Sequence, residues 1–426
     1  MKKILIISPH FPPSNLTAVH RSRLFAQHLP SFGWEPIILT VHEKFYEEKL
    51  DHHLEKLLPA DLRVEKVNAF RITKPRLIGD IGLRSFFQLY KKAKQIINQE
   101  KIDFLYISVP SFYTALLGRW LHSSTNIKYA IDYIDPWVHR FPGTEKVFSR
   151  HWITTHIAKI LEPIAVKKAS LITGMAEGYY KGVMERNPHL LKQALFGEMP
   201  FGGEEEDHKI VAKLGIAPYL FKKKEGKLLL LYAGAMLPKA YAPLERIFKV
   251  IQAEPQLFSN IEFHFIGTGK SPNDPESYNI KSLAEQYGLW QTTVFEYPQR
   301  IPYLDVLVHL HCADGIFILG STEPHYTPSK IFQGVMSGKP ILAVLHQQSS
   351  AGRVLETAKA GILLNFNGVE ELDLIEQRFA KAFEGLLHLT TIYHPPETNA
   401  EKKLLEQYSA KSITGQLSEL LNRIVK

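Results

Sequence analysis

Cysteine is nearly absent from this sequence, which has one, Cys312, among its 426 residues. An internal disulfide is therefore excluded, and the apolar residues around Cys312 predict a buried thiol. Long apolar runs are absent too, since none reaches the roughly 18 residues of a membrane-spanning helix. Residues 1–7 are too short for a secretory signal and favour a first strand. These absences predict a protein of the cytoplasm.

Several catalytic signatures are also lacking. The strand–turn–helix opening at residues 4–29 has no G-x-G-x-x-G, which counts against a dinucleotide-dependent oxidoreductase. The histidines are scattered without ligand spacing, no convincing Asp-x-Asp ends a strand, and G-x-S-x-G is absent. Neither a metal centre nor a serine nucleophile is therefore predicted.

The composition is that of a soluble globular protein, with 45% hydrophobic and 22% charged residues. The length suits two domains better than one. The formal net charge of +8 favours anionic partners, which could be nucleotide phosphates, anionic lipid or nucleic acid. The charge alone does not choose among them.

Short apolar runs alternate with helical segments through both halves of the chain. This alternation predicts parallel sheets with right-handed crossovers, and its restart predicts two Rossmann-like domains. Residues 195–207, rich in glycine and acids, separate the two blocks. The fold class is therefore α/β, with domains at residues 1–200 and 201–400. The expected strands are residues 4–8, 37–40, 102–109, 129–134, 228–232, 262–266, 293–297, 315–319, 341–345 and 362–366.

One stretch of the second half combines helix and strand signals. Thr327 can cap a helix, and Pro328 suits its first position because the missing N–H would be unpaired there anyway. Gly338 ends this helix and Pro340 prevents its continuation. A cation in the first turn, Lys330, is unfavourable for the helix dipole, so a bound anion would explain it. The alternative is a solvated lysine on an ordinary strand–helix unit.

The sequence PSKIFQGVMSGKPILAV, residues 328–344, resembles the donor-site segment of GT-B glycosyltransferases, in particular the large retaining family 4. FPP at residues 11–13 and DYIDPW at residues 132–137 resemble further segments of that family. The resemblance implies two Rossmann-like domains facing across a cleft, with a C-terminal helix, residues 408–426, packing back on the first domain. It also implies a metal-independent hexosyltransferase that retains the configuration of the sugar.

The resemblance also implies substrates and a location. The donor would be a nucleotide-diphosphate sugar, used as a co-substrate, and no cofactor is implied. The acceptor would be a glycan or a lipid-linked molecule in surface polysaccharide biosynthesis, and nucleic acid is not an expected partner. The enzyme would be cytoplasmic, and peripheral contact with the inner face of the cytoplasmic membrane is left open.

Transfer requires fixed cations and amides that stabilise the leaving diphosphate. The resemblance gives this catalytic work to Lys330, to Lys239 and to the backbone of Gly234. Asp135 follows a strand end on the ligand side of a parallel sheet, so we expect it near the acceptor or the reaction. Its alternative is a turn-forming Asp before Pro. The other implied donor residues are Gly267, Thr268, Glu323, His325, Ser329 and Gln333, and the implied acceptor-side residues are Pro13, Asn15 and Arg21.

The chain departs from the family pattern at several of these places. Ala235 stands where an arginine is usual, and His325 and Gln333 stand where two glutamates are usual. Glu323 could replace the first glutamate or be a loop acid, and Arg21 could be a solvated helix charge. The alternatives are therefore an active enzyme with a variant donor site, a slower enzyme, a catalytically degenerate partner in glycan assembly, and a nucleotide-sugar epimerase.

Residues 70–94 mix basic and apolar side chains and are expected to be helical from Leu83. Such a helix can rest on an anionic membrane surface. It can equally be an ordinary helix that packs on the sheet. The sequence leaves both interpretations open.

Overall fold

The computed structural model describes residues 1–426 except 74–77, 110, 139–145, 272, 394–405 and 426. The chain divides into two compact units. Unit 1 comprises Met1–Phe201 together with Ala410–Lys426, and unit 2 comprises Gly202–Ser409. The C-terminal segment therefore belongs to the same unit as the N-terminus.

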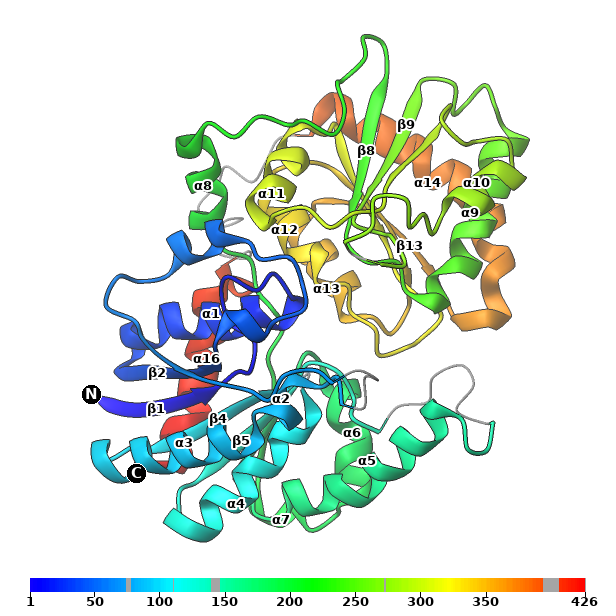
Figure 1. The fold of residues 1–426 in the computed structure, drawn as a ribbon. Coiled ribbons are helices and arrows are strands. Elements are labelled where there is room, and N and C mark those ends of the chain that lie inside the picture. The colour runs from blue at the N-terminus through cyan, green and yellow to red at the C-terminus, as the bar shows by residue number, and fades with distance from the viewer. Residues whose placement is uncertain (74–77, 110, 139–145, 272, 394–405, 426) are drawn as a thin grey trace. The chain divides into compact units, whose positions relative to one another are not determined.

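Unit 1 is built on a seven-stranded parallel sheet with the strand order β3-β2-β1-β4-β5-β6-β7. Helices cover its faces, as a parallel sheet requires (Figure 1). The strands are β1 (Lys2–Ile7), β2 (Trp34–Val41), β3 (Arg63–Val67), β4 (Phe104–Val109), β5 (Tyr129–Tyr133), β6 (Leu171–Gly174) and β7 (Leu195–Glu198). The helices are α1 (Thr17–His28), α2 (Ile81–Arg84), α3 (Phe86–Glu100), α4 (Ala115–Thr125), α5 (Arg150–Val166), α6 (Glu177–Arg186), α7 (Leu190–Gln193) and α16 (Ala410–Ile424).

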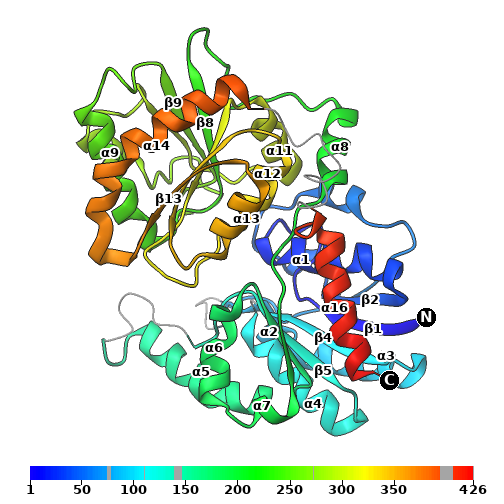
Figure 2. The same cartoon turned by 180° about the vertical axis from the view of Figure 1, so that it is seen from behind.

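Helix α16 closes one face of the unit 1 sheet. Its apolar residues recur at helical spacing, and Ile413, Leu417 and Leu421 are buried. They share a core with Phe25 of α1 and Trp34 of β2. Figure 2 shows α16 beside α1, far from it in sequence but adjacent in the fold.

Unit 2 contains a six-stranded parallel sheet with the order β10-β9-β8-β11-β12-β13. Its strands are β8 (Leu228–Ala233), β9 (Ile261–Ile266), β10 (Val294–Tyr297), β11 (Gly315–Leu319), β12 (Ile341–His346) and β13 (Gly361–Phe366). Its helices are α8 (Glu205–Leu214), α9 (Tyr241–Ala253), α10 (Lys281–Gln286), α11 (Tyr303–Cys312), α12 (Lys330–Met336), α13 (Ser350–Ala358) and α14 (Leu372–Ile392). Helices α9 and α14 pack against each other (Figure 1).

Short 3₁₀ turns complete the two units. They are η1 (Leu29–Phe32), η2 (Glu43–Phe45), η3 (His52–Leu57), η4 (Phe112–Thr114), η5 (Pro238–Ala240) and η6 (Gly368–Glu371). Among the described helices, none combines the length and the apolar character that crossing a membrane requires.

The predicted α/β class with two parallel sheets is confirmed. In each sheet the strand order reverses once, between β1 and β4 in unit 1 and between β8 and β11 in unit 2. Open parallel sheets bind their ligands outside the carboxyl ends of the strands at such a reversal. The loops that follow β1, β4, β8 and β11 are therefore the places to search for a site.

Two local predictions are wrong. Helix α12 begins at Lys330, its N-cap Ser329 makes no capping side-chain bond, and the Thr327 hydroxyl instead lies 2.7 Å from that of Ser350. Cys312 is half-buried, since it ends α11 at the margin of the core.

Candidate functional site

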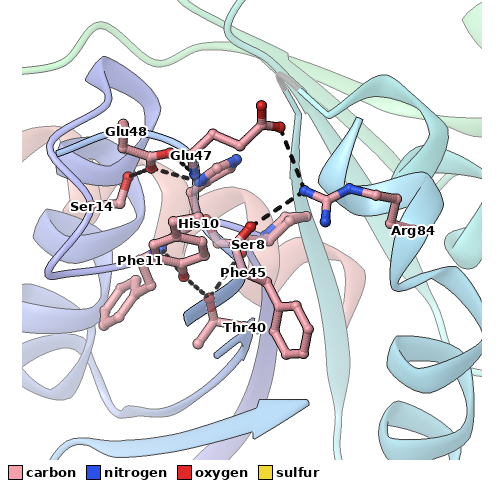
Figure 3. A network of polar contacts seen from close by, with 11 residues as sticks. Ser8, His10, Phe11, Ser14, Thr40, Phe45, Glu47, Glu48 and Arg84 are labelled. Atoms are coloured by element: carbon pink, nitrogen blue, oxygen red, sulfur yellow. Dashed lines mark hydrogen bonds and ion pairs between the residues drawn. The ribbon is translucent and has the colours of Figure 1, made fainter. Parts of the chain in front are cut away.

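A polar network lies where β1 ends, at the strand reversal of unit 1 (Figure 3). The imidazole Nδ1 of His10 is 2.8 Å from Oε1 of Glu48, and the Ser14 hydroxyl donates to the same oxygen. The N–H of Phe11 donates to the hydroxyl of Tyr46 at 3.0 Å. The loop after β1 and the loop after β2 are thereby joined by side chains.

Arg84 ties a third segment to this network. Its guanidinium donates to the carbonyls of Phe70 at 2.9 Å and Phe45 at 3.3 Å, and it lies 3.6 Å from the carboxylate of Glu47 (Figure 3). The Arg84 side chain is buried. Helix α2 is therefore fixed against the loop after β2 by one buried cation.

Glu48 gives the network a measurable pH dependence. Burial raises the pKa of its carboxyl, but the hydrogen bond and charge of His10 and the Ser14 hydroxyl outweigh burial and lower the pKa to about 2. A carboxyl whose pKa is lower in the folded than in the unfolded chain stabilises the folded state at a pH above its unfolded pKa. This stabilisation is lost as the pH falls through the folded pKa.

We expect Glu48→Gln to lower the free energy of unfolding at pH 7 by roughly 1–3 kcal/mol. The variant should also lose less stability than the wild type between about pH 4.5 and pH 2. Urea unfolding at a series of pH values measures both, with the exposed Glu185→Gln as the matched control. Parallel pH profiles for wild type and Glu48→Gln would contradict this role.

The predicted acceptor-side residues separate into two groups. Pro13 and Asn15 flank Ser14 in the network: the Pro13 carbonyl accepts the N–H of Asp51 at 2.7 Å, and the Asn15 amide oxygen lies 3.3 Å from Nε2 of His20. They hold the loop at the carboxyl edge of β1. Arg21 lies elsewhere, inside the unit.

Arg21 forms a buried ion pair with Asp132 of β5. Its Nε is 2.5 Å from Oδ2 and its Nη2 is 2.8 Å from Oδ1, while Nη1 donates to the carbonyl of Met199. Burial alone would lower the pKa of Arg21, but the Asp132 carboxylate outweighs it and raises the pKa. The solvated-charge alternative is wrong, and the guanidinium is engaged within unit 1 instead of facing an acceptor.

Asp135 is exposed at the carboxyl edge of β5, where parallel-sheet geometry predicts a ligand-facing residue. Two residues later, Trp137 is buried and stacks on Phe112 with ring centroids 5.9 Å apart and planes at 5°. This stack anchors the loop that follows β5 to the segment that follows β4. Asp135 thus lies on a loop that the Trp137–Phe112 stack fixes in place, and its side chain is at the surface.

In unit 2, the side chain of Lys330 turns inward to the end of β8. Its Nζ lies 3.5 Å from the ring centroid of Tyr232, and a Cβ built on Gly234 would come within 3.3 Å of it. Nζ is shielded from solvent and has no hydrogen-bond partner among the residues that the structure describes. Lys330 as a whole residue is only half-buried, but the position of the charged atom decides its energetics.

Burial lowers the pKa of the Lys330 ammonium to about 7. The Tyr232 ring offers its face to the cation, which compensates only part of the lost hydration. An anion placed against Nζ would favour the charged form. The charge of Lys330 would therefore increase if an anion were bound beside Nζ.

Lys239 and Glu323, two predicted site residues, form an ion pair in unit 2. Lys239 Nζ is 2.9 Å from Glu323 Oε1, and the N–H of Thr322 donates to the Lys239 carbonyl at 3.1 Å. The loop after β11 is thereby tied to η5, which follows β8. His325 and Ser329, both half-buried, lie farther along the same loop.

The loop after β9 uses its predicted residues in two ways. Gly267 has φ +73°, which favours glycine, and its backbone lies at the carboxyl edge of β9. The Thr268 side chain is buried, and its hydroxyl donates to the Glu296 carboxylate at 2.7 Å. That carboxylate also accepts the N–H of Ile280 at 2.9 Å. The Thr268 side chain therefore stabilises the loop after β9 from within.

Gln333, expected to meet ribose hydroxyls, bonds to a pair of histidines. Its amide oxygen lies 2.7 Å from Nε2 of His208, whose Nδ1 lies 2.9 Å from Nε2 of His311. An amide oxygen only accepts, so His208 Nε2 donates to Gln333. Burial lowers the pKa of His208 to about 4, against the effect of its bond to Gln333. Gln333 keeps its amide N–H groups for other partners.

Sequence reasoning missed several of these groups, above all His10, Tyr232 and His208. His10 follows β1 and Tyr232 lies near the end of β8, and both strands border a strand reversal. Once the strand order is known, this position marks both residues as candidates for a ligand site. His208 carried no signal, because its partners come from helices more than a hundred residues later. Within the described ranges, no three His, Cys, Asp or Glu side chains gather in a way that could hold a metal ion.

No protein-family model matches the chain, and no curated protein matches it in sequence. Solved structures do match over the full length. Sucrose-phosphate synthase from Thermosynechococcus elongatus superposes with a TM-score of 0.66 at 12% identity, covering 100% of this chain and 99% of that chain. The UDP-forming trehalose-phosphate synthase from Burkholderia xenovorans gives 0.63 at 10% identity, covering 100% of both chains.

HepE from Anabaena, solved in complex with UDP, superposes with a TM-score of 0.60 at 14% identity, covering 99% of this chain and 100% of that chain. At these identities the likeness concerns the fold. Each of the three matches covers both units of this chain. The chain therefore has the GT-B fold of glycosyltransferases.

Proposed function

We propose that the protein is a glycosyltransferase that moves a sugar from a nucleotide-diphosphate donor to a glycan or lipid-linked acceptor. The observation that carries the proposal is the buried, unpaired Nζ of Lys330 beside the backbone of Gly234. A buried amine without a counter-ion is unfavourable unless a ligand supplies the charge. HepE, which shares the fold, was solved with UDP and with UDP-glucose, so UDP-sugars are the first donors to test.

In this proposal Lys330 meets the negative charge that builds on the leaving diphosphate. The backbone amides near Gly234 and Gly267 approach the same group, because neither residue carries a side chain. Lys239 supplies a second cation whose charge is shared with Glu323 at 2.9 Å. Fixed cations in a shielded site act strongly on developing charge, since they need no reorganisation during the reaction.

The finer parts of the proposal rest on the sequence resemblance. They are retention of the anomeric configuration, transfer without a metal ion, and a product in surface polysaccharide. Asp135 is the proposed acceptor-side catalytic residue, supported by its exposure at the carboxyl edge of β5. Work in the cytoplasm with peripheral membrane contact completes the proposal.

Calorimetry with a panel of nucleotide diphosphates tests the donor site. We expect UDP or another diphosphate to bind the wild type and the exposed Lys381→Met control alike, and to bind Lys330→Met at least tenfold more weakly, as loss of a charged hydrogen bond predicts. Equal binding by Lys330→Met would refute the site.

Incubation with the matching donor separates the alternatives. Conversion of the donor sugar to an epimer without acceptor would indicate an epimerase. Binding without hydrolysis or transfer would indicate a non-catalytic partner in glycan assembly. Transfer to acceptor that Lys330→Met abolishes is the expected result.

Gly234→Ala should disturb the donor site by crowding the side chain of Lys330. Gly234 has φ +130°, and a Cβ there would lie 3.3 Å from both Cε and Nζ of Lys330. We expect backbone strain of about 1–2 kcal/mol and diphosphate binding weakened several-fold. Gly288→Ala is the matched control, because it also has positive φ but open space around its Cα. Unchanged binding in Gly234→Ala would show that this backbone is remote from the ligand.

A further inference from the structure

Helix α5 of unit 1 has an unusual outer face. Ile153, Ile157, Ile160 and Ile164 recur at intervals of four, three and four residues, so they form one stripe along the helix. All four are exposed, Ile160 at 67%. The opposite face, with Thr155, Ala158, Ala165 and Val166, packs into the unit. A surface helix normally turns polar residues outward, whereas α5 is apolar on both faces.

The apolar surface continues into the segment before the helix. Val147 and Phe148 are 64% and 79% exposed, and the Phe148 ring lies 5.4 Å from that of Trp152 in the first turn of α5. Val147, Phe148 and the four isoleucines are called the α5 face below.

The segment that carries the α5 face is rich in exposed positive charge. The segment from residue 146 to residue 168 has a single carboxylate, Glu162, which is buried and paired with Arg186 at 2.8 and 2.9 Å. The α5 face therefore has no exposed acidic neighbour within its own segment. Its exposed cations are Lys146, Arg150, Lys159, Lys167 and Lys168.

We propose that the α5 face binds the surface of an anionic lipid bilayer. A helix that presents a stripe of large apolar side chains flanked by cations lies in the interface between headgroups and acyl chains. Lipid phosphates would neutralise the flanking lysines while the isoleucines leave water. A second copy of this chain is a poor occupant, because two such faces would bring like charges together.

The α5 face lies outside residues 70–94, the segment for which the sequence left both membrane contact and packing on the sheet open. Helix α3 begins in the basic segment of residues 70–94 and extends beyond it to Glu100. It buries Leu89, Ala93, Ile96 and Ile97, as a helix that packs on the sheet does, while Phe87 is 64% exposed. Lys74 and Arg76 of that segment lie outside the described residues. The inference deepens the proposed function by assigning the surface that would meet a lipid-linked acceptor, but the binding itself requires no donor.

Vesicle flotation with the full chain tests the proposal. Binding is expected to vesicles of phosphatidylcholine mixed with phosphatidylglycerol, to weaken as salt rises, and to be much lower on phosphatidylcholine alone. Ile160→Ser/Ile164→Ser should weaken binding by about tenfold or more. The matched control is Val369→Ser in unit 2, which also removes an exposed apolar side chain, 69% exposed, and should bind as the wild type does.

Three results would overturn the proposal. They are absence of binding to the anionic vesicles, equal binding by the isoleucine variant and the control, and a dimer in light scattering that this variant dissolves. Calorimetry with UDP on the isoleucine variant keeps the two proposals apart. If the isoleucine variant binds UDP as the wild type does but no longer binds vesicles, the α5 face is supported. If the wild type binds vesicles but does not bind UDP, the donor site is wrong and the α5 face stands.

Discussion

Lys330→Met is expected to cut sugar transfer by a factor of about a hundred to a thousand, the usual cost of removing one preorganised group that stabilises developing charge. The Nζ of Lys330 has no hydrogen-bond partner among the described residues, so a bound diphosphate would be its main source of stabilisation. Methionine keeps the unbranched aliphatic part of the side chain and removes the ammonium group that lies over the Tyr232 ring. Single-turnover transfer by Lys330→Met and by the Lys381→Met control measures the effect.

In the absence of ligand, Lys330→Met should raise the stability of the fold, although it lowers activity. Burial lowers the folded pKa of Lys330 to about 7, whereas an unfolded lysine titrates near pH 10.4. The unfolded chain therefore binds more protons between these values, and the wild type gains stability as the pH rises from about 7 to 10. Lys330→Met should lack this gain and be more stable than the wild type at pH 7, by a few kcal/mol.

Urea unfolding at pH 7 and at pH 9.5 separates these outcomes. A variant that loses both activity and stability at pH 7 would have a damaged fold, and the loss of transfer would then say nothing of the charge. A variant that keeps transfer near the wild-type rate would contradict the role of Lys330 directly.

Asp132→Ala is expected to destabilise unit 1 by about 3–5 kcal/mol, because it leaves the Arg21 guanidinium buried without its carboxylate. Arg21 and Asp132 are 1% and 0% exposed, so water cannot replace the lost partner. The Thr173 hydroxyl, which donates to the same carboxylate at 2.7 Å, would lose its acceptor as well.

A double variant shows whether the loss of stability comes from removing the ion pair or from leaving one of its charges buried alone. Arg21→Met/Asp132→Leu removes both charges and should recover much of the stability lost in Asp132→Ala, since buried ion pairs cost desolvation. Asp103→Ala, at the N-terminal side of β4, is the surface control, with an expected loss below about 1 kcal/mol. Additive losses in the double variant would contradict the account of a coupled pair.

Apolar runs predicted the central strands of both sheets, because a buried parallel strand requires a continuous apolar segment. Strand β12, expected at residues 341–345, spans Ile341–His346. Strands β3 and β7 lie at the two edges of the unit 1 sheet and were not expected. The resemblance of the Lys330 segment predicted the fold, which the solved structures confirm.

Side-chain partners distant in sequence could not be predicted. Arg21 and Asp132 lie 111 residues apart, and they meet only because β1 and β5 belong to one sheet with β4 between them. Thr327 had the local features of a helix N-cap, yet its hydroxyl forms a hydrogen bond with that of Ser350, which is 23 residues away. The isoleucines of α5 have helical spacing, but spacing alone does not tell which face of a helix turns outward.

Proton uptake on binding UDP tests the central claim, that Lys330 holds the diphosphate of the donor. At pH 8 an amine with a pKa of about 7 is mostly neutral, and a bound diphosphate should protonate it, so about 0.9 proton should be taken up per UDP. Calorimetry in two buffers of different ionisation enthalpy gives this number. The account predicts uptake close to one proton for the wild type and close to zero for Lys330→Met. UDP binding to the wild type without proton uptake, or equal uptake by both proteins, would contradict it.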